Sequence, residues 1–557
     1  MTLAMSVSED REATRAYRVG RLYLIYACGF VAFAFIMAVL SALGVPDRIT
    51  GALLAIYVAV LFIFVAASTG TMKVREFFAA GRRIPPGLNG MAMAIGGASA
   101  GSFTAMVAAL YLLGHAGFAF VIGACGAFIV GAVLIGPYLR RSGAYTLPDF
   151  LSARFGSVAR VLGVLALLAC TLPLLAAQLN GFSYVLALLL DIDLTTGLQV
   201  GFVMLTLCTV LGGMRSTTWT QVAQYIVLII ALAVVIIWVL LLHPLSFGVV
   251  DLAFGQPRTA QEDALSFTGI AYAAEGYGAD FWLLALCLMV GGASLPHMAT
   301  RAITLSDPQV SRDSMAWGLF FTALLGLAAP VVAGLARWAV DGGMTTPSPD
   351  LITVALPSIS GMPFVFTAMA CLGALAALLA AASALLVTAA NSLGHDIYCR
   401  LISRNAAASS RLIVPRILMV GLAFGATHVA ETQEFDFLTL SSWSLALAAG
   451  GLFPALVLGI WWRRANGTGA VLGMLAGTAI TLLALIGNRF YAAELADVLA
   501  LLPRLGDLSL AALGVPVGLV VTVLASLATR QPSGQHRAFQ EALHRPTGGT
   551  LIEDAAA

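Results

Sequence analysis

The stretch Met91–Thr104 reads MAMAIGGASAGSFT and places glycine and serine residues in the middle of an apolar run. The surrounding segment, from Ile84 to Leu139, contains no Asp, Glu, Lys or Arg. Such a run is typical of a membrane span or a protein core, whereas glycine and serine weaken a helix and let backbone groups face a ligand. The tetrapeptide GGAS returns at Gly291–Ser294, where the nearby Pro296 lacks an amide donor and favours a helix break. Two interrupted apolar segments of this kind indicate a transporter binding site, unless GGAS recurs by chance among 56 glycines.

Composition places the chain in a membrane. Of its 557 residues 60% are hydrophobic and only 10% are charged, whereas soluble domains carry about 25% charge. The uncharged runs are too long for β-barrel strands, so we expect an all-α integral membrane protein. The basic residues are dispersed, which disfavours nucleic acid as a partner. The seven cysteines have no CxxC spacing and are expected to be small buried residues rather than disulfides or metal ligands.

Fourteen apolar segments are long enough to cross about 30 Å of hydrocarbon as helices. The first also resembles the apolar core of a cleavable signal peptide, but such cores are only about 7–15 residues long, which favours a membrane helix. The predicted spans are 22–46, 50–72, 88–113, 117–139, 161–190, 195–214, 217–242, 281–300, 314–339, 362–394, 412–430, 437–462, 468–487 and 508–529.

The distribution of basic residues predicts the orientation. With a cytoplasmic N-terminus and alternating spans, 24 of the 29 Lys and Arg residues fall on the inside and 5 on the outside. This predicts a multi-pass protein of the bacterial inner (plasma) membrane with a cytoplasmic N-terminus (1–21) and a cytoplasmic tail (530–557). The two GGAS spans then run in opposite directions, which predicts inverted repeats of five helices each at 88–242 and 281–462. Two further helices would precede them (22–72) and two would follow (468–529).

Few polar residues lie inside the predicted spans, and they mark either a substrate path or hydrogen bonds between helices. Gln178 and Asn180 share one span, and Gln221 and Ser383 lie in two others. His297 follows Pro296 and is expected to be a packing residue or interface anchor rather than a proton carrier. No cluster of His, Cys, Asp and Glu has the spacing of a transition-metal site, and no nucleotide-binding or hydrolase motif occurs. We therefore expect neither a cofactor nor an enzyme.

The chain resembles the sodium:solute symporter family in several stretches that occur in the same order. The stretches LPHMATR and WTQVAQY look most like the acetate and short-chain monocarboxylate branch. The resemblance implies a leucine-transporter-like fold with ten core helices in two inverted repeats. The matching stretches are REFFAAGRRIPPGLNGMA (75–92), YTLPDFLSARFGS (145–157), GGMRSTTWTQVAQYIVLI (212–229), LPHMATRAITLSDPQVSRDSMAWGLFF (295–321), NSLGHDIYCRL (391–401) and SSWSLALAAGGLFPALVLGIWWRRANGTGAVLGMLAG (441–477).

The chain departs from sodium-coupled relatives at the place of the coupling ion. Two adjacent hydroxyl residues of the eighth core helix bind the ion in those relatives, and the corresponding positions here are Ala380 and Ala381. An acidic residue often follows Trp-Thr in the fifth core helix, where this chain has Gln221. Both Na⁺ and H⁺ remain open as the coupling cation. The candidate cation-binding residues implied by the resemblance, with Ser383 as a possible substitute, are Ile95, Ala98, Ala377, Ser383 and Gln221.

These features predict a secondary active transporter that imports a small monocarboxylate, such as acetate, propionate or pyruvate, with a monovalent cation by alternating access. Because the Arg residues within predicted spans, Arg337 and Arg416, lie within five residues of a span end, we expect free amides near Gly96–Ser99 and Gly292–Leu295 to meet the carboxylate. The alternative is a transporter-like sensor or subunit that binds a solute without moving it, which the short segment after Thr529 disfavours. The candidate substrate-binding residues are Gly96, Gly97, Ser99, Ser102, Gln178, Asn180, Gly292 and Ser294.

Overall fold

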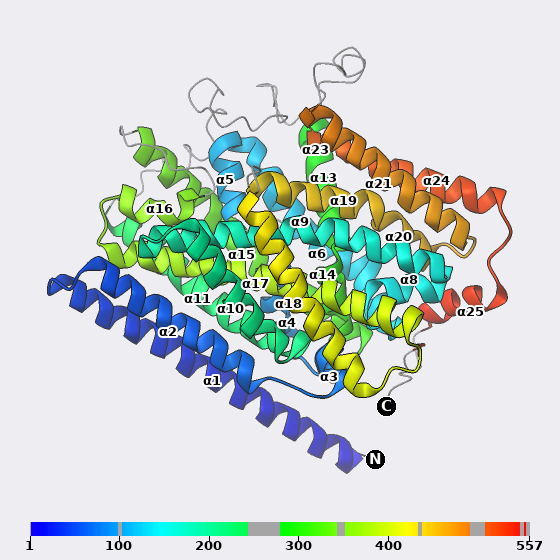
Figure 1. The fold of residues 1–557 in the computed structure, drawn as a ribbon, viewed down its shortest axis with the longest axis horizontal. Helices are drawn as coiled ribbons and strands as arrows, with labels where there is room; N and C mark the ends of the chain where they lie inside the picture. The colour runs from blue at the N-terminus through cyan, green and yellow to red at the C-terminus, as the bar shows by residue number, and fades with distance from the viewer. Residues whose placement is uncertain are drawn as a thin grey trace.

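The computed structural model describes residues 2–97, 103–242, 279–341, 351–432, 437–490, 507–545 and 551–552. Every regular element within these ranges is a helix, as the composition predicted (Figure 1). The first half of the chain forms α1 (Thr2–Ala42), α2 (Asp47–Ser68), α3 (Val74–Ala79), η1 (Ala80–Arg82), α4 (Pro86–Gly97), α5 (Phe103–Leu113), η2 (Gly114–Gly117), α6 (Phe118–Val130), η3 (Gly131–Ile135), α7 (Gly136–Ser142), α8 (Leu147–Phe155), α9 (Ser157–Leu190), α10 (Leu194–Val210) and α11 (Gly213–Leu242). The second half forms α13 (Ala279–Ser294), α14 (Pro296–Ile303), α15 (Pro308–Asp341), α16 (Ile352–Ile359), α17 (Phe364–Ser392), η5 (Leu393–Ile402), α18 (Ala408–Thr432), α19 (Phe437–Gly451), α20 (Phe453–Trp461), α21 (Gly467–Phe490), α23 (Asp507–Ala511), α24 (Gly514–Ala528) and α25 (Gly534–Leu543).

Ten helices of the described residues are long and apolar enough to cross a membrane, or eleven if the bent pair α13 and α14 counts as one span. The predicted number of fourteen is therefore not confirmed. One reason is that α5, α6 and α7 run on as a single helical stretch, although Gly114 turns the backbone between α5 and α6 with a φ of 57°. Another is that α10 and α24 are apolar but shorter than a full span.

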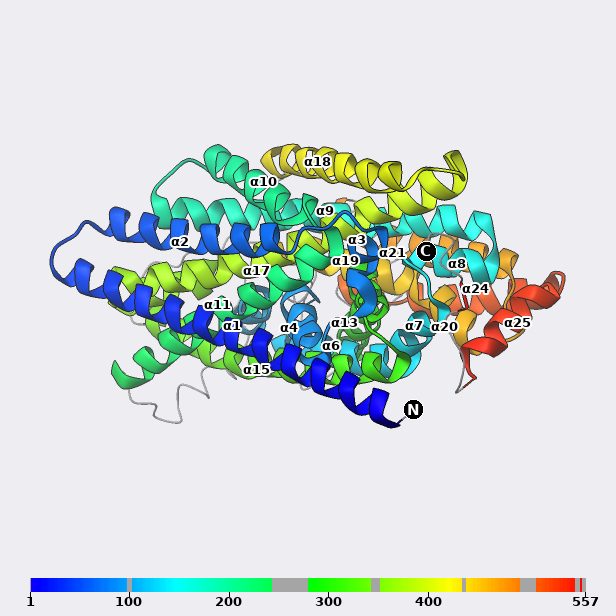
Figure 2. The ribbon, with the colours of Figure 1, turned by 90° about the horizontal axis from the view of Figure 1, so that it is seen from below.

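Helix α17 forms the centre of the molecule, and α1 lies at its edge. In the span that contains α17, 94% of the most apolar stretch is buried, compared with 17% in the span formed by α1. Helix α17 packs against α9, α11 and α4, while α13 packs against α6 and α15 against α4. Figures 1 and 2 show α1 and α2 along one edge and α21 and α24 at the opposite one. The interrupted helices α4 and α14 contact each other within the interior.

The N-terminal helix α1 is attached to the core through aromatic residues. The hydroxyl of Tyr23 donates a hydrogen bond to the carbonyl of Trp219 on α11, at 2.9 Å. The two rings also stack, with centroids 6.4 Å apart and an angle of 16° between their planes. The first predicted span, 22–46, therefore packs against a core helix through Tyr23.

The short helix α8 is defined by local signals at both ends. The Thr146 hydroxyl accepts a hydrogen bond from the backbone amide of Asp149 at 3.1 Å. Pro148 occupies the first turn, where a backbone N–H would have no acceptor within the helix, so proline costs no hydrogen bond there. The helix ends at Gly156, whose φ of 96° is a conformation that favours glycine. These signals place Asp149 in the first turn, facing the end of the α17 and η5 segment.

Candidate functional site

The second GGAS motif coincides with a helix break. Helix α13 ends at Ser294 and α14 begins at Pro296, with a bend of 45° between them. Leu295 between them has an extended backbone, and its amide donates to the Gly291 carbonyl at 2.9 Å. The Ser294 hydroxyl donates to the carbonyls of Val290 (2.8 Å) and Ala448 (3.1 Å). The sequence therefore predicted the break correctly, while Ser294 and the Leu295 amide bond to the protein itself in this conformation.

The first GGAS motif lies where α4 ends, at Gly97, and residues 98–102 fall outside the described part of the chain. The predicted site residues Ala98, Ser99 and Ser102 are among them. The two described glycines lie in close contact with other helices. A Cβ atom on Gly96 would lie 2.9 Å from the Nε2 of Gln221, and one on Gly97 would lie 1.9 Å from the Sδ of Met298. Glycine thus permits α4 to approach both α11 and α14.

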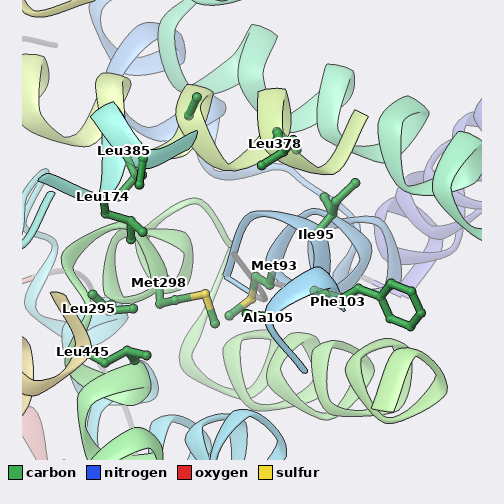
Figure 3. Close-up of a cluster of buried hydrophobic side chains, with 14 of the residues drawn as sticks. Met93, Ile95, Phe103, Ala105, Leu174, Leu295, Met298, Leu378, Leu385 and Leu445 are labelled. Atoms are coloured by element: carbon green, nitrogen blue, oxygen red, sulfur yellow. The ribbon is translucent and has the colours of Figure 1, made fainter. Parts of the chain in front are cut away.

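A cavity joins the two motifs. Gly97 and Gly292 both line it, and the side chain of Met298 extends across the space between α14 and α4 toward Met93 (Figure 3). The centre of a water-sized sphere can occupy about 20 Å³ of this cavity, which is room for about one water molecule. The other lining residues come from α6, α13, α15 and α19 and are mostly apolar: Phe120, Ala124, Ala127, Phe128, Leu288, Thr322 and Leu445.

Thr322 supplies the one hydroxyl group among these lining residues. It is fully buried on α15, and its Oγ1 has no hydrogen-bond partner among the described residues. A buried hydroxyl without a partner is costly unless a ligand or water completes it, so Thr322 is a candidate substrate contact. Sequence reasoning missed it, because a single threonine in the apolar run LFFTALL resembles any threonine that bonds to its own helix.

The predicted polar residues of α9 lie away from this cavity. Gln178 is fully buried but is not among the lining residues. Asn180 is half-buried, and its Nδ2 donates to the Ala430 carbonyl of α18 at 3.2 Å. The described structure therefore brings together Gly97, Gly292 and Met298 but leaves these two amide side chains elsewhere.

Gln221 lies at the junction of α4, α11 and α17. Its Nε2 donates to the carbonyl of Ala380 at 2.7 Å, and its Oε1 accepts a hydrogen bond from Arg301. Arg301 also donates to the Thr218 hydroxyl at 2.5 Å. The arginine is 2% exposed and lies within α14, which continues to Ile303. The expectation that amides alone would supply positive potential near the site is therefore wrong, because the helix after the break carries Arg301, one residue beyond the predicted span, inward instead of ending in a loop.

The other candidate cation ligands are dispersed. Ile95 is buried on α4, and Ala377 lines a different apolar cavity beside Phe103 and Leu228. The Ser383 hydroxyl donates to the Leu379 carbonyl of its own helix at 2.7 Å. In this conformation Ser383 therefore directs its hydroxyl hydrogen along α17.

The comparisons with known proteins agree with this geometry. Residues 77–477 match the sodium:solute symporter family. The chain belongs to that family. A protein named as an uncharacterized symporter of Cupriavidus necator is 29% identical, with 91% of this chain and 95% of that protein covered. A monocarboxylic acid transporter of Corynebacterium glutamicum is 30% identical, with coverages of 79% and 84%.

Solved structures place this family member in the leucine-transporter-like fold. A Na⁺-coupled sialic acid symporter, in a substrate-bound outward-open state, superposes with a TM-score of 0.70 at 15% identity, covering 86% of this chain and 98% of that chain. A nucleobase-cation-symport-1 family transporter gives a TM-score of 0.50 at 13% identity, with coverages of 85% and 99%. At these identities the likeness concerns the fold alone. The chain is thus a multi-pass membrane protein of a transporter family, and its membership supports cation-coupled symport.

A second polar cluster of this family member lies apart from the cavity. Asp149, His395 and Asp396 bring one ligand atom each to within 4.8 Å of one another, and all three are buried. The sequence did not reveal the cluster because α8 and η5 are far apart in the chain. Arg160 forms an ion pair with Asp149 at 3.1 Å. Burial alone would raise the pKa of the Asp149 carboxyl, but its interactions with His395, Arg400 and Arg160 lower it below its ordinary value.

Proposed function

We propose that this chain is a secondary active symporter that imports a small monocarboxylate, such as acetate, propionate or pyruvate, together with a monovalent cation. The observation that carries the proposal is the cavity between the two interrupted helices, whose described lining residues are apolar apart from Thr322 and its hydroxyl. A short alkyl chain is compatible with such walls, and a carboxylate accepts hydrogen bonds from hydroxyl and amide donors. The name of the Corynebacterium relative, a monocarboxylic acid transporter, supports the same substrate class.

Charge supports an anionic substrate. No residue that lines the cavity among the described residues is acidic, so a cationic amine would lack a counter-ion there. Arg301 lies three residues after the cavity residue Met298 on α14, which is about 4.5 Å along the helix axis. Residues three apart share a helix face, so the guanidinium adds a positive potential close to the cavity.

The size of the cavity supports alternating access. Space for about one water molecule is too small for a carboxylate of four or more heavy atoms. Binding therefore requires α4 and α14 to separate, or the Met298 side chain to move from Gly97. Movement at a break such as Leu295–Pro296 opens such a site without unwinding a continuous helix.

We extend the proposal to the topology: fourteen spans with both termini cytoplasmic, and inverted repeats at 88–242 and 281–462. The cavity then lies between the interrupted first helix of each repeat. We also propose Ser99 and Ser102, which lie outside the described residues, as substrate contacts.

The test is uptake of a panel of labelled carboxylates by a host that lacks its own carboxylate transport. We expect uptake of at least one short monocarboxylate above the empty-vector level, and counterflow of the same solute in proteoliposomes. Binding of a carboxylate without counterflow would favour the alternative, a sensor or subunit. Transport of an amine or sugar with no carboxylate uptake would show that the substrate class is wrong.

A further inference from the structure

Arg301 is a buried cation without a carboxylate partner in the described part of the chain. Its guanidinium donates to the Thr218 hydroxyl and to Gln221 Oε1, which are both neutral. Only 2% of the residue is exposed. A buried charge is normally compensated by an opposite charge, because removing it from water is unfavourable. An uncompensated positive charge in the interior therefore needs a functional account.

Gln221 fixes the position of this charge relative to three helices. Its Nε2 donates to the Ala380 carbonyl on α17 and lies 2.9 Å from where a Cβ of Gly96 on α4 would be. The carboxamide thus fills the space between α4 and α17. Its oxygen accepts a hydrogen bond from Arg301 and its nitrogen donates one to the Ala380 carbonyl, so both polar groups of the carboxamide have partners within the protein.

This space adjoins the position at which the sequence resemblance placed the coupling cation. Ala380 and Ala381 replace the two hydroxyl ligands of sodium-coupled relatives, and Gln221 replaces the acidic residue. Sodium is a hard cation that binds oxygen atoms. Here the Gln221 oxygen and the Thr218 hydroxyl oxygen accept hydrogen bonds from Arg301, and the Ala380 carbonyl accepts one from Gln221. The donor set therefore does not fit a sodium ion, and the adjacent guanidinium would repel one.

We propose that Arg301 is a fixed cation that replaces the coupling sodium ion at this position, held there by Gln221 and Thr218. A glutamine at position 221 leaves the arginine charge uncompensated, whereas an acidic residue would neutralise it. The inference rests on the proposed symport function and excludes Na⁺ as its coupling cation, which leaves H⁺ of the two open candidates. The transport cycle then needs no Na⁺ at the junction of α4, α11 and α17.

A measurement on the purified full-length protein tests this without a substrate. Thermal unfolding in detergent is followed in NaCl and in choline chloride at equal ionic strength. We expect the same unfolding temperature in both salts, because no sodium binds the native state. A higher unfolding temperature in NaCl than in choline chloride would overturn the proposal.

Uptake in proteoliposomes tests the role of the charge. The most strongly transported member of a panel of labelled acetate, propionate and pyruvate serves as the probe. Wild-type uptake should agree within about twofold between sodium and choline buffers, whereas Arg301→Ala should lose about tenfold in sodium-free buffer. Added NaCl or guanidinium chloride should restore part of that loss, because either supplies the missing cation. The matched control is Arg154→Ala, since Arg154 is equally buried but donates to the carbonyls of Gly459 and Trp462, far along the chain from this site. Its uptake should show no recovery with either cation.

Each other outcome overturns the inference. The first is a fall of about tenfold in wild-type uptake when sodium is removed. The second is full uptake by Arg301→Ala in sodium-free buffer. The third is a loss of uptake in Arg301→Ala that neither NaCl nor guanidinium chloride restores. If the Arg301→Ala protein is not recovered from membranes, the Gln221→Glu variant is tested in its stead, because a carboxylate at position 221 neutralises the guanidinium charge without removing Arg301. That variant should also lose sodium-free uptake. Absence of uptake of every carboxylate by the wild type would instead refute the proposed function, and the unfolding measurement would still decide the ion assignment.

Discussion

A Cβ atom on Gly97 would lie 1.9 Å from the Sδ of Met298, so the ends of two interrupted helices meet with no space for a side chain. Both residues line the same small cavity. Contact between α4 and α14 therefore depends on glycine at this position, and we propose that separation of the two helices opens the cavity.

Substitution of Gly97 by leucine should abolish transport. The larger side chain would displace Met298 and fill the cavity, while the surrounding apolar helices still insert into the membrane. Uptake and membrane abundance are measured together. The control is Gly421→Leu, because a Cβ at Gly421 on α18 meets no atom within 4 Å, and it should transport normally. Normal uptake by a well-expressed Gly97→Leu protein would refute this site.

The Thr322 hydroxyl should contribute to substrate recognition. Thr322→Val keeps the shape of the side chain but removes the hydroxyl, and we expect kcat/KM for uptake to fall about tenfold, the value of roughly one hydrogen bond to a charged group. Thr322→Ser should retain most of the activity. Thr206→Val is the control, because the Thr206 hydroxyl donates to the Phe202 carbonyl of its own helix. Equal kinetics for Thr322→Val and the wild type would remove Thr322 from the site.

Competition experiments should identify an anionic substrate. None of the described residues that line the cavity is acidic, and Arg301 lies one helical turn away. Acetate, propionate or pyruvate in excess should reduce uptake of the labelled carboxylate, whereas proline and glucose should have little effect. Strong competition by proline or glucose, with none from the carboxylates, would contradict the assignment.

The segment 243–280 should be external and the segment 395–411 cytoplasmic, as the distribution of basic residues predicts. Ser266 lies outside the described residues, and a single cysteine there should react with an impermeant thiol reagent in intact cells. The background needs replacement of Cys28 and Cys125, since the other native cysteines are buried. Reaction only after lysis would reverse the orientation.

Asp149 should stabilise the protein in a pH-dependent way. Its pKa is lowered in the folded state, so its stabilising contribution is present above the pKa of the unfolded chain and is lost as pH falls through the folded value. The wild type should unfold at a higher temperature than Asp149→Asn at pH 7, with a constant difference down to about pH 5 and a smaller one below about pH 4. A difference that does not change with pH would show that the carboxylate charge is not responsible.

The sequence predicted the helical membrane fold and the helix break at Leu295–Pro296, because apolar length, glycine and proline act locally. It did not predict the environment of Arg301. That residue lies next to the predicted end of a span, and only the direction of α14 after the 45° bend turns it toward Gln221. Asn180 likewise bonds to Ala430 on α18, a partner that no local pattern specifies. Tertiary packing decides both cases.

The contact between Tyr23 and Trp219 has a practical consequence for shortening the chain. Trp219 precedes Gln221 by two residues on α11, and the Tyr23 ring covers its indole on the side toward α1. A truncation that removes α1 would uncover this indole and remove the hydrogen bond from the Tyr23 hydroxyl to the Trp219 carbonyl. Truncated chains that begin after Ala42 should therefore be compared with the full-length protein for detergent stability before their uptake is interpreted.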